Sequence, residues 1–252
     1  MICPSCHGHP YAGGLICQHC GGVGIVHCCE GERAQPDATA HHVSRIGDLI
    51  VFGDFPSRLV KALGVIADAL HPAFDCQSWT RPGWSKRSCV LASLTCRDFL
   101  RALGYDDAKA YACALVMRGV DAAGRELHSL GIGDLPGQPQ PPDGFWIGHM
   151  VVVVPSARLM LDTTLYTAMR PHWPMLSGMI ATTMGTPARS ITTFGKHPFA
   201  AAELFDPASG HYLGIIWLDD HHNKTWRRGP DAVENWRRSA ALATLQERFE
   251  GQ

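Results

Sequence analysis

Residues 145–164 read Phe-Trp-Ile-Gly-His-Met-Val-Val-Val-Val-Pro-Ser-Ala-Arg-Leu-Met-Leu-Asp-Thr-Thr. An apolar run with four consecutive valines and a second apolar run, Leu-Met-Leu, flank a Pro-Ser pair, which is the pattern of two strands joined by a tight turn. The sequence therefore predicts strands over 146–154 and 158–163. His149 is the one titratable side chain of the first strand, and Asp162 is the one acid of the second.

The register of this predicted hairpin brings the two polar side chains together. The midpoint of positions 149 and 162 falls inside the turn, so we expect His149 and Asp162 to lie directly opposite each other. Opposed side chains on one face of a hairpin have Cβ atoms about 4.5–5.5 Å apart. A carboxylate there can accept the imidazole N–H, which leaves the second ring nitrogen free to act on a thiol. Two polar groups that are each costly to bury also satisfy each other as a pair.

Cys89 is the candidate nucleophile. It begins an apolar helical pattern that we predict over 88–103, directly after a Lys-Arg-Ser sequence. A cysteine in the first turn of a helix faces the positive end of the macrodipole and free backbone amides, which favour thiolate over thiol. Taken alone, a free cysteine is more often a buried core residue. We expect that core role for Cys96 and Cys113, which lie inside helix and strand patterns.

The remaining patterns complete a mixed α+β domain. In chain order they predict a helix opening at 57 with Ser57 as its N-cap, a strand over 111–117, a Gly/Pro-rich loop over 131–144, a strand over 212–218 and an amphipathic helix over 231–249 with Val233, Trp236, Leu242, Leu245 and Phe249 facing inward. Segment 166–207 gives only a weak pattern, because prolines and glycines interrupt its apolar pieces.

Residues 1–30 form a cysteine-rich module. Six of the ten cysteines lie in this module, and thiols of a protein without an export signal stay reduced. Two Cys-x-x-Cys pairs can supply the four thiolates of a tetrahedral structural Zn²⁺ site. The predicted ligands are Cys3, Cys6, Cys17 and Cys20. The polar segment 31–42 is interpreted as a linker to a domain over 43–252.

Glycines follow each cysteine pair. The sequence Cys17-Gln-His-Cys20-Gly-Gly-Val-Gly24 fits the pattern Cys-x-x-Cys-x-Gly-x-Gly, and the first pair fits it except at Pro10. The module resembles the cysteine-rich zinc module of DnaJ-type co-chaperones. The chain shows no J-domain, so the resemblance does not imply chaperone activity. It implies a small zinc module that binds a protein partner or stabilises one end of the chain.

Three short motifs resemble the transglutaminase-like superfamily. They are Ser-Cys-Val-Leu-Ala at 88–92, Gly-His-Met-Val-Val-Val at 148–153 and Leu-Asp-Thr-Thr at 161–164. The resemblance covers roughly residues 57–170. It implies a papain-like fold, with a nucleophile helix packed on an antiparallel sheet.

The resemblance also implies roles for the three residues. Cys89 would be acylated, His149 would shuttle the proton and Asp162 would orient the imidazole. The chain departs from the family where it has Asp-Thr in place of a frequent Asp-Pro. It also lacks an aromatic residue directly before the nucleophile, the nearest being Trp84. Both departures weaken assignment to a subfamily without removing a catalytic group.

The functional hypothesis is a cysteine peptidase, amidase or acyltransferase that works through a thioester. Its substrate would be a protein or another peptide-like amide. One enzymatic alternative is an arylamine N-acetyltransferase, although the 60 positions between Cys89 and His149 exceed its usual interval. The alternative from another class is a zinc-dependent interaction protein whose triad is vestigial.

Composition argues against several other classes of protein, namely those that bind nucleic acid, span a membrane or are secreted. The formal net charge of −1 gives no bias toward nucleic acid, and we interpret the Trp-Arg-Arg sequences at 226–228 and 236–238 as a solvated helix face. No apolar run approaches the roughly 18 residues of a membrane span. No secretory signal begins the sequence, so we expect a cytoplasmic protein.

Overall fold

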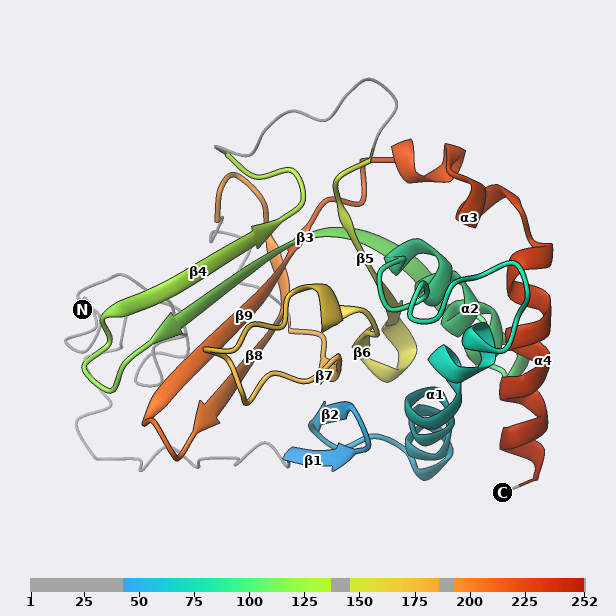
Figure 1. Cartoon of the computed structure of the whole chain (residues 1–252), viewed down its shortest axis with the longest axis horizontal. Helices are drawn as coiled ribbons and strands as arrows, with labels where there is room; N and C mark the ends of the chain where they lie inside the picture. Colours follow the sequence, from blue (N-terminus) through green and yellow to red (C-terminus); the bar gives the residue numbers. More distant parts are fainter. Residues whose placement is uncertain (1–42, 137–145, 186–192, 252) are drawn as a thin grey trace.

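A curled mixed sheet organises the part of the chain that this computed structural model describes, residues 43–136, 146–185 and 193–251 (Figure 1). The four predicted zinc ligands, the predicted linker and most of the predicted loop over 131–144 lie outside the described residues. The described part combines nine strands with four α-helices. The predicted α+β class is therefore confirmed.

The elements have the following bounds. The strands are β1 Val43–Ile46, β2 Leu49–Phe52, β3 Lys109–Val120, β4 Glu126–Ile132, β5 His149–Val154, β6 Leu159–Asp162, β7 Met179–Thr183, β8 Pro198–Asp206 and β9 His211–Asp219. The helices are α1 Ser57–Asp75, α2 Cys89–Ala102, α3 Pro230–Val233 and α4 Trp236–Glu250. Short 3₁₀ turns cover Pro155–Ala157, Leu165–Thr167 and Thr225–Arg228.

The strand order is β1-β2-β7-β6-β5-β3-β9-β8, with β4 as an additional partner of β3. Strand β3 makes this branching possible because it is twelve residues long. Its first half pairs with β5 and its second half with β4, while β9 runs along its other edge. Strands β2 and β7 pair in parallel. The expectation of a wholly antiparallel sheet is therefore wrong at this position.

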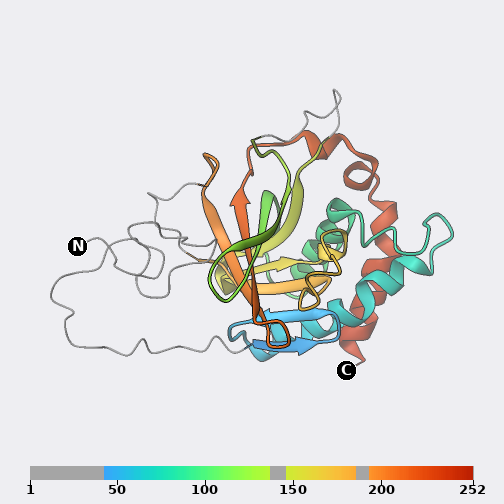
Figure 2. The ribbon, with the colours of Figure 1, turned by 60° about the vertical axis from the view of Figure 1, so that its left-hand side comes forward.

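Each face of the sheet carries its own apolar core. Val152 and Val154 belong to a cluster with buried residues of α1, α2 and α4. Val151 and Val153 belong to a second cluster, which includes Trp217 and the buried residues that follow β6. Alternation of side chains along β5 explains the division. Figure 2 shows the helices gathered on one side of the sheet.

Several sequence predictions need correction. Strand β4 lies before and inside the predicted loop, and β7 and β8 occupy the weakly patterned segment. The predicted C-terminal helix is split between α3 and α4, and the 3₁₀ turn at 225–228 precedes both. Val233 and Trp236, predicted to face inward, are exposed. Leu245 is buried as predicted, and Leu242 and Phe249 pack against the core.

Ser88 caps the helix that carries the candidate nucleophile. Its hydroxyl accepts a hydrogen bond from the Leu91 N–H (3.3 Å) and donates one to Asp231 Oδ2 (2.5 Å). In Ser88→Ala, the Leu91 N–H and the Asp231 carboxylate each lose a hydrogen bond. We therefore expect this variant to lower the free energy of unfolding by about 1–2 kcal/mol in urea titrations.

Ser57 provides the matched control for this prediction. The prediction that Ser57 caps α1 is wrong, because Pro56 holds the N-cap position and no side chain makes a capping bond there. Ser57→Ala is therefore expected to change the unfolding free energy by less than about 0.5 kcal/mol. Equal losses in the two variants would contradict the structural role of the Ser88 cap.

Candidate functional site

His149 and Asp162 form a buried hydrogen-bonded pair. Strands β5 and β6 pair with Val152 opposite Leu161, which places Asp162 diagonally from His149 on the same face. The prediction of direct opposition is therefore wrong. The turn contains a full 3₁₀ segment followed by Arg158 at φ 50°, which moves the centre of the hairpin by one position. The diagonal is short enough for His149 Nε2 to lie 2.6 Å from Asp162 Oδ2.

Two further donors hold the Asp162 carboxylate. The Trp217 Nε1–H donates to Oδ2 over 2.9 Å, and the backbone N–H of Thr164 donates to Oδ1 over 3.1 Å. Trp217 lies on β9, which β3 and β5 separate from β6 in the sheet. The curl of the sheet lets the indole reach across that face. Asp162 is fully buried and fixed by three donors, so it also fixes the orientation of His149.

The surroundings of His149 favour its protonated form. Burial alone lowers the pKa of this imidazole, but the charge and hydrogen bond of Asp162 raise it, and the neighbouring Cys89 thiol raises it further. The balance raises the pKa of His149 to about 10. Because Asp162 engages Nε2, Nδ1 is the nitrogen left to face Cys89. The structure thus brings the three predicted residues together.

Cys89 is the first residue of α2 and is half-buried. Ser88 satisfies the next amides of the helix, since its hydroxyl binds the Leu91 N–H and its carbonyl binds the Ala92 N–H. Within the described residues, the N–H groups of Cys89 and Val90 have no hydrogen-bond partner. Free amides at the positive end of a helix stabilise negative charge, on a thiolate or on the oxygen of an attacked carbonyl.

Two other cysteines have the core role that the sequence predicts. Cys96 and Cys113 are fully buried, and burial raises the pKa of both thiols. A thiol that is kept neutral and away from solvent is a poor nucleophile. The contrast singles out Cys89, since the remaining described cysteine, Cys76, is exposed and lies outside the cavity lining.

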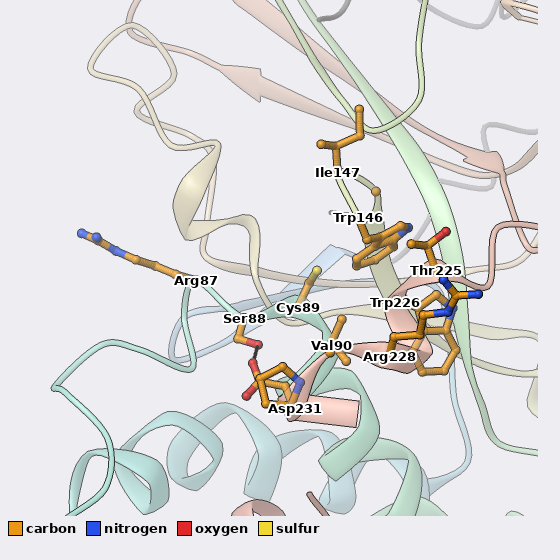
Figure 3. Close-up of a pocket in the computed structure, with 13 residues that line it drawn as sticks. Arg87, Ser88, Cys89, Val90, Trp146, Ile147, Thr225, Trp226, Arg228 and Asp231 are labelled. Carbon is orange, nitrogen blue, oxygen red and sulfur yellow. Dashed lines mark hydrogen bonds between the residues drawn. The ribbon is translucent and has the colours of Figure 1, made fainter. Parts of the chain in front are cut away.

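A cavity of about 610 Å³ opens at Cys89 (Figure 3). Three segments line it: the start of α2, residues 146–148 before β5, and residues 225, 226 and 228–231 after β9. Figure 3 shows the Cys89 side chain pointing toward the space beside Trp146, with Trp226 and Arg228 next to Trp146 on the side away from Arg87. The cavity therefore offers the nucleophile both an opening and two aromatic surfaces.

The sequence reasoning did not find several of these residues. Trp217 lies in a predicted strand, and only the curl of the sheet shows that its indole binds Asp162. The interpretation of 226–228 as a solvated helix face is wrong, because these residues belong to a 3₁₀ turn from which Trp226 and Arg228 line the cavity. The strand pattern alone gives Trp146 no special role, although Gly148 indicates that a neighbouring group lies close to the backbone. A glycine next to a polar strand position often marks a close approach of a neighbouring group.

Gly148 is in contact with the indole of Trp146. A Cβ atom built at position 148 would lie 2.4 Å from Trp146 Cε2, so an alanine must displace the ring from the cavity wall. We expect Gly148→Ala to destabilise the protein by about 1–3 kcal/mol and to change its tryptophan fluorescence. Gly64→Ala is the control, because a Cβ in the interior of α1 meets only Ile46 Cγ2, at 3.9 Å. A tolerated Gly148→Ala with unchanged fluorescence would contradict this packing.

A second buried histidine, His71, forms hydrogen bonds to residues next to the site. His71 lies 2.9 Å from Ser85 Oγ through Nδ1 and 2.9 Å from the Thr163 carbonyl through Nε2. Burial lowers the pKa of His71 to about 4, so the ring is neutral at pH 7. The carbonyl can only accept, hence Nε2 carries the proton and Ser85 donates to Nδ1. These two hydrogen bonds connect the loop before Cys89 to Thr163, the residue after Asp162.

No family model, curated protein or solved structure matches this chain. Residues 43–136, 146–185 and 193–251 contain no group of three or more His, Cys, Asp or Glu side chains suited to a metal ion. Within the same residues, none of the helices has the length and apolar character needed to cross a membrane.

Proposed function

We propose that the protein is a thiol acyl enzyme with Cys89 as nucleophile, His149 as general base and acid, and Asp162 as the residue that orients His149. One observation carries the proposal. A buried, carboxylate-bound imidazole meets a cysteine at the open end of a helix, and that cysteine lines a cavity. Structural ion pairs also perturb pKa values, but they do not require a nucleophile and a cavity beside them.

The proposed reaction begins with the thiolate of Cys89 and the imidazolium of His149. The sulfur attacks an amide or ester carbonyl carbon, the C–S bond forms and the carbonyl electrons move to oxygen. The free amides at the start of α2 are placed to stabilise that oxyanion. When the C–N or C–O bond breaks, the leaving amine or alcohol takes the proton of His149, and a thioester remains on Cys89.

The second half returns the enzyme to its starting state. A water molecule or an amine enters, His149 takes its proton, and attack on the thioester expels the Cys89 thiolate. Water gives a carboxylic acid and hence a peptidase or amidase, whereas an amine gives a new amide and hence an acyltransferase. The same residues serve both outcomes, and the access of the second nucleophile to the cavity decides between them.

The packing of α2 supports a papain-like arrangement of this site. The helix packs directly against β5 and β3, and Ser93 Oγ donates to the Met150 carbonyl over 3.0 Å. Nucleophile and base thus lie on two elements joined by a buried hydrogen bond. Such rigid support is needed because acyl transfer depends on the position of a nucleophile to within about 1 Å.

Acylation by p-nitrophenyl acetate tests the proposal. We expect p-nitrophenol release and an acetyl group on the Cys89 peptide by mass spectrometry, cleavable by hydroxylamine as a thioester. Cys89→Ser is expected to lose the thioester, and His149→Ala to form it far more slowly. Equal acetylation of Cys76 and Cys89 in the wild-type protein would contradict a specific nucleophile.

We propose a structural role for the zinc module in the same protein. We propose that Cys3, Cys6, Cys17 and Cys20 bind one Zn²⁺, measured as one equivalent of zinc in the purified protein. The alternative, a zinc-dependent interaction protein with a vestigial triad, is favoured if zinc is present and Cys89 forms no thioester with any activated ester.

A further inference from the structure

The two Trp-Arg-Arg sequences have different surroundings. In the second, at 236–238, both arginines are engaged by the protein itself. Arg237 pairs with Asp231 at 3.1 Å and with Glu234 at 2.7 Å. The Arg238 side chain is buried, and it donates to the Asp231 carbonyl and to the Asn235 side chain. These two cations hold α3 and α4 together.

The first Trp-Arg-Arg sequence lines the cavity instead. Trp226 and Arg228 are part of the cavity wall, whereas Arg227 lies over the Trp226 ring and outside the lining. Among the described residues, no carboxylate lies within ion-pair distance of Arg228. Asp231 is the one carboxylate of the lining. It already accepts a hydrogen bond from Ser88 and pairs with Arg237 of α4.

Other groups add positive charge and donors around the same space. Arg87 belongs to the lining and is exposed, without an ion-pair partner among the described residues, and Figure 3 shows its side chain extending away from Cys89 on the side opposite Trp146. The start of α2 is positive as well, whereas the charge of protonated His149 is neutralised by Asp162. The Trp146 Nε1–H is buried in the cavity wall and has no hydrogen-bond acceptor among the described residues. The cavity thus combines free donors and cations with aromatic walls.

We propose that the acyl donor carries an anionic group, a carboxylate or a phosphate, that Arg228 binds beside an aromatic or apolar portion held by Trp226 and Trp146. This inference rests on the proposed function of the same site. The guanidinium fork matches both anions, and a tryptophan face accepts flat apolar groups. Arg228 is exposed, so a neutral peptide segment leaves its charge to water, whereas an anion gains charge-assisted hydrogen bonds from its guanidinium.

Alkylation by iodoacetate and iodoacetamide measures this discrimination, because the two reagents differ in charge and little in size. We compare the iodoacetate-to-iodoacetamide rate ratio at Cys89 with the same ratio at the exposed Cys76 of the same chain. The ratio is expected to be higher at Cys89, and Arg228→Gln is expected to lower it about three- to tenfold. Arg227→Gln is the matched control, since it removes the same charge one residue away from the lining.

The outcomes separate this inference from the proposed function. If Cys89 reacts with iodoacetamide no faster than Cys76, the proposed function fails first. If Cys89 reacts fast but its ratio equals that of Cys76, or falls equally in Arg228→Gln and Arg227→Gln, the anion site is overturned. A loss confined to Arg228→Gln supports it.

Protection experiments then identify the anion. The probes are 3-phenylpropanoate, phenyl phosphate and the neutral 3-phenylpropanamide, each tested for slowing the alkylation of Cys89 by iodoacetamide. We expect one of the two anions to protect better than the amide, and Arg228→Gln to abolish the difference. Better protection by the carboxylate or by the phosphate names the class of acyl donor. Equal protection by all three probes would overturn the proposal.

Discussion

Asp162→Asn is expected to slow the alkylation of Cys89 by iodoacetamide about tenfold or more at pH 7. The substitution keeps the volume of the side chain and removes its charge. Burial is the largest influence on His149 and lowers its pKa, while Asp162 provides the main opposing effects. Without the carboxylate, His149 becomes neutral and the thiolate loses its cation. An ordinary thiol is only about 3% thiolate at pH 7, which sets the scale of the loss.

Asp107→Asn controls for removal of a carboxylate that contacts the same hairpin. Asp107 is exposed and binds Ser156 in the turn between β5 and β6, remote from His149 along the strand. We expect its effect on the Cys89 rate to be less than about twofold, since exposed charges are screened by water and salt. Thermal melting of both variants separates altered reactivity from altered folding. Unchanged reactivity in folded Asp162→Asn would contradict the role of Asp162.

Trp217→Ala is expected to lower the free energy of unfolding by about 3–5 kcal/mol. Trp217 is the largest fully buried side chain of the described residues, and it fills the core on the face of the sheet opposite the helices. Its loss leaves a cavity and removes a donor from the buried Asp162 carboxylate. Urea titration measures the change, with the m-value checking that the unfolding transition stays two-state.

Two further tryptophan variants separate packing from hydrogen bonding. Trp217→Phe keeps most of the ring volume and loses the Nε1–H donor, so we expect a smaller loss of about 1–3 kcal/mol. Trp84→Ala removes an exposed tryptophan near the nucleophile helix and is expected to cost less than about 1 kcal/mol. Comparable losses in Trp84→Ala and Trp217→Ala would show that the core described around Trp217 is wrong.

The residues of the candidate triad could be singled out from sequence because they are local exceptions to apolar patterns. His149 and Asp162 interrupt two strands, and Cys89 opens a helix, so each is visible within a short window. Side chains alternate between the two faces of a strand. His149 and Asp162 therefore still share one face, although the predicted register was wrong. Their contact is diagonal because the turn is longer than a Pro-Ser pair suggests.

The rest of the site depends on contacts between distant parts of the chain. Trp217 reaches Asp162 only because the sheet curls, and Arg228 reaches the cavity only because the segment after β9 crosses the start of α2. Strand β4 was missed because it pairs with β3 at the edge of the sheet and is largely exposed, which leaves little apolar alternation to detect. Tertiary packing determines these features, and periodicity does not encode them.

The pH profile of Cys89 alkylation by iodoacetamide, in wild type and His149→Ala, tests the central claim most directly. An ordinary thiol is about 0.1% thiolate at pH 5.5, so residual reactivity there reports an ion pair. We expect the wild-type midpoint to lie more than one pH unit below that of the exposed Cys76 in the same sample, and His149→Ala to remove the difference. Coincident profiles for Cys76 and Cys89, or a His149→Ala profile identical to wild type, would contradict a thiolate–imidazolium pair.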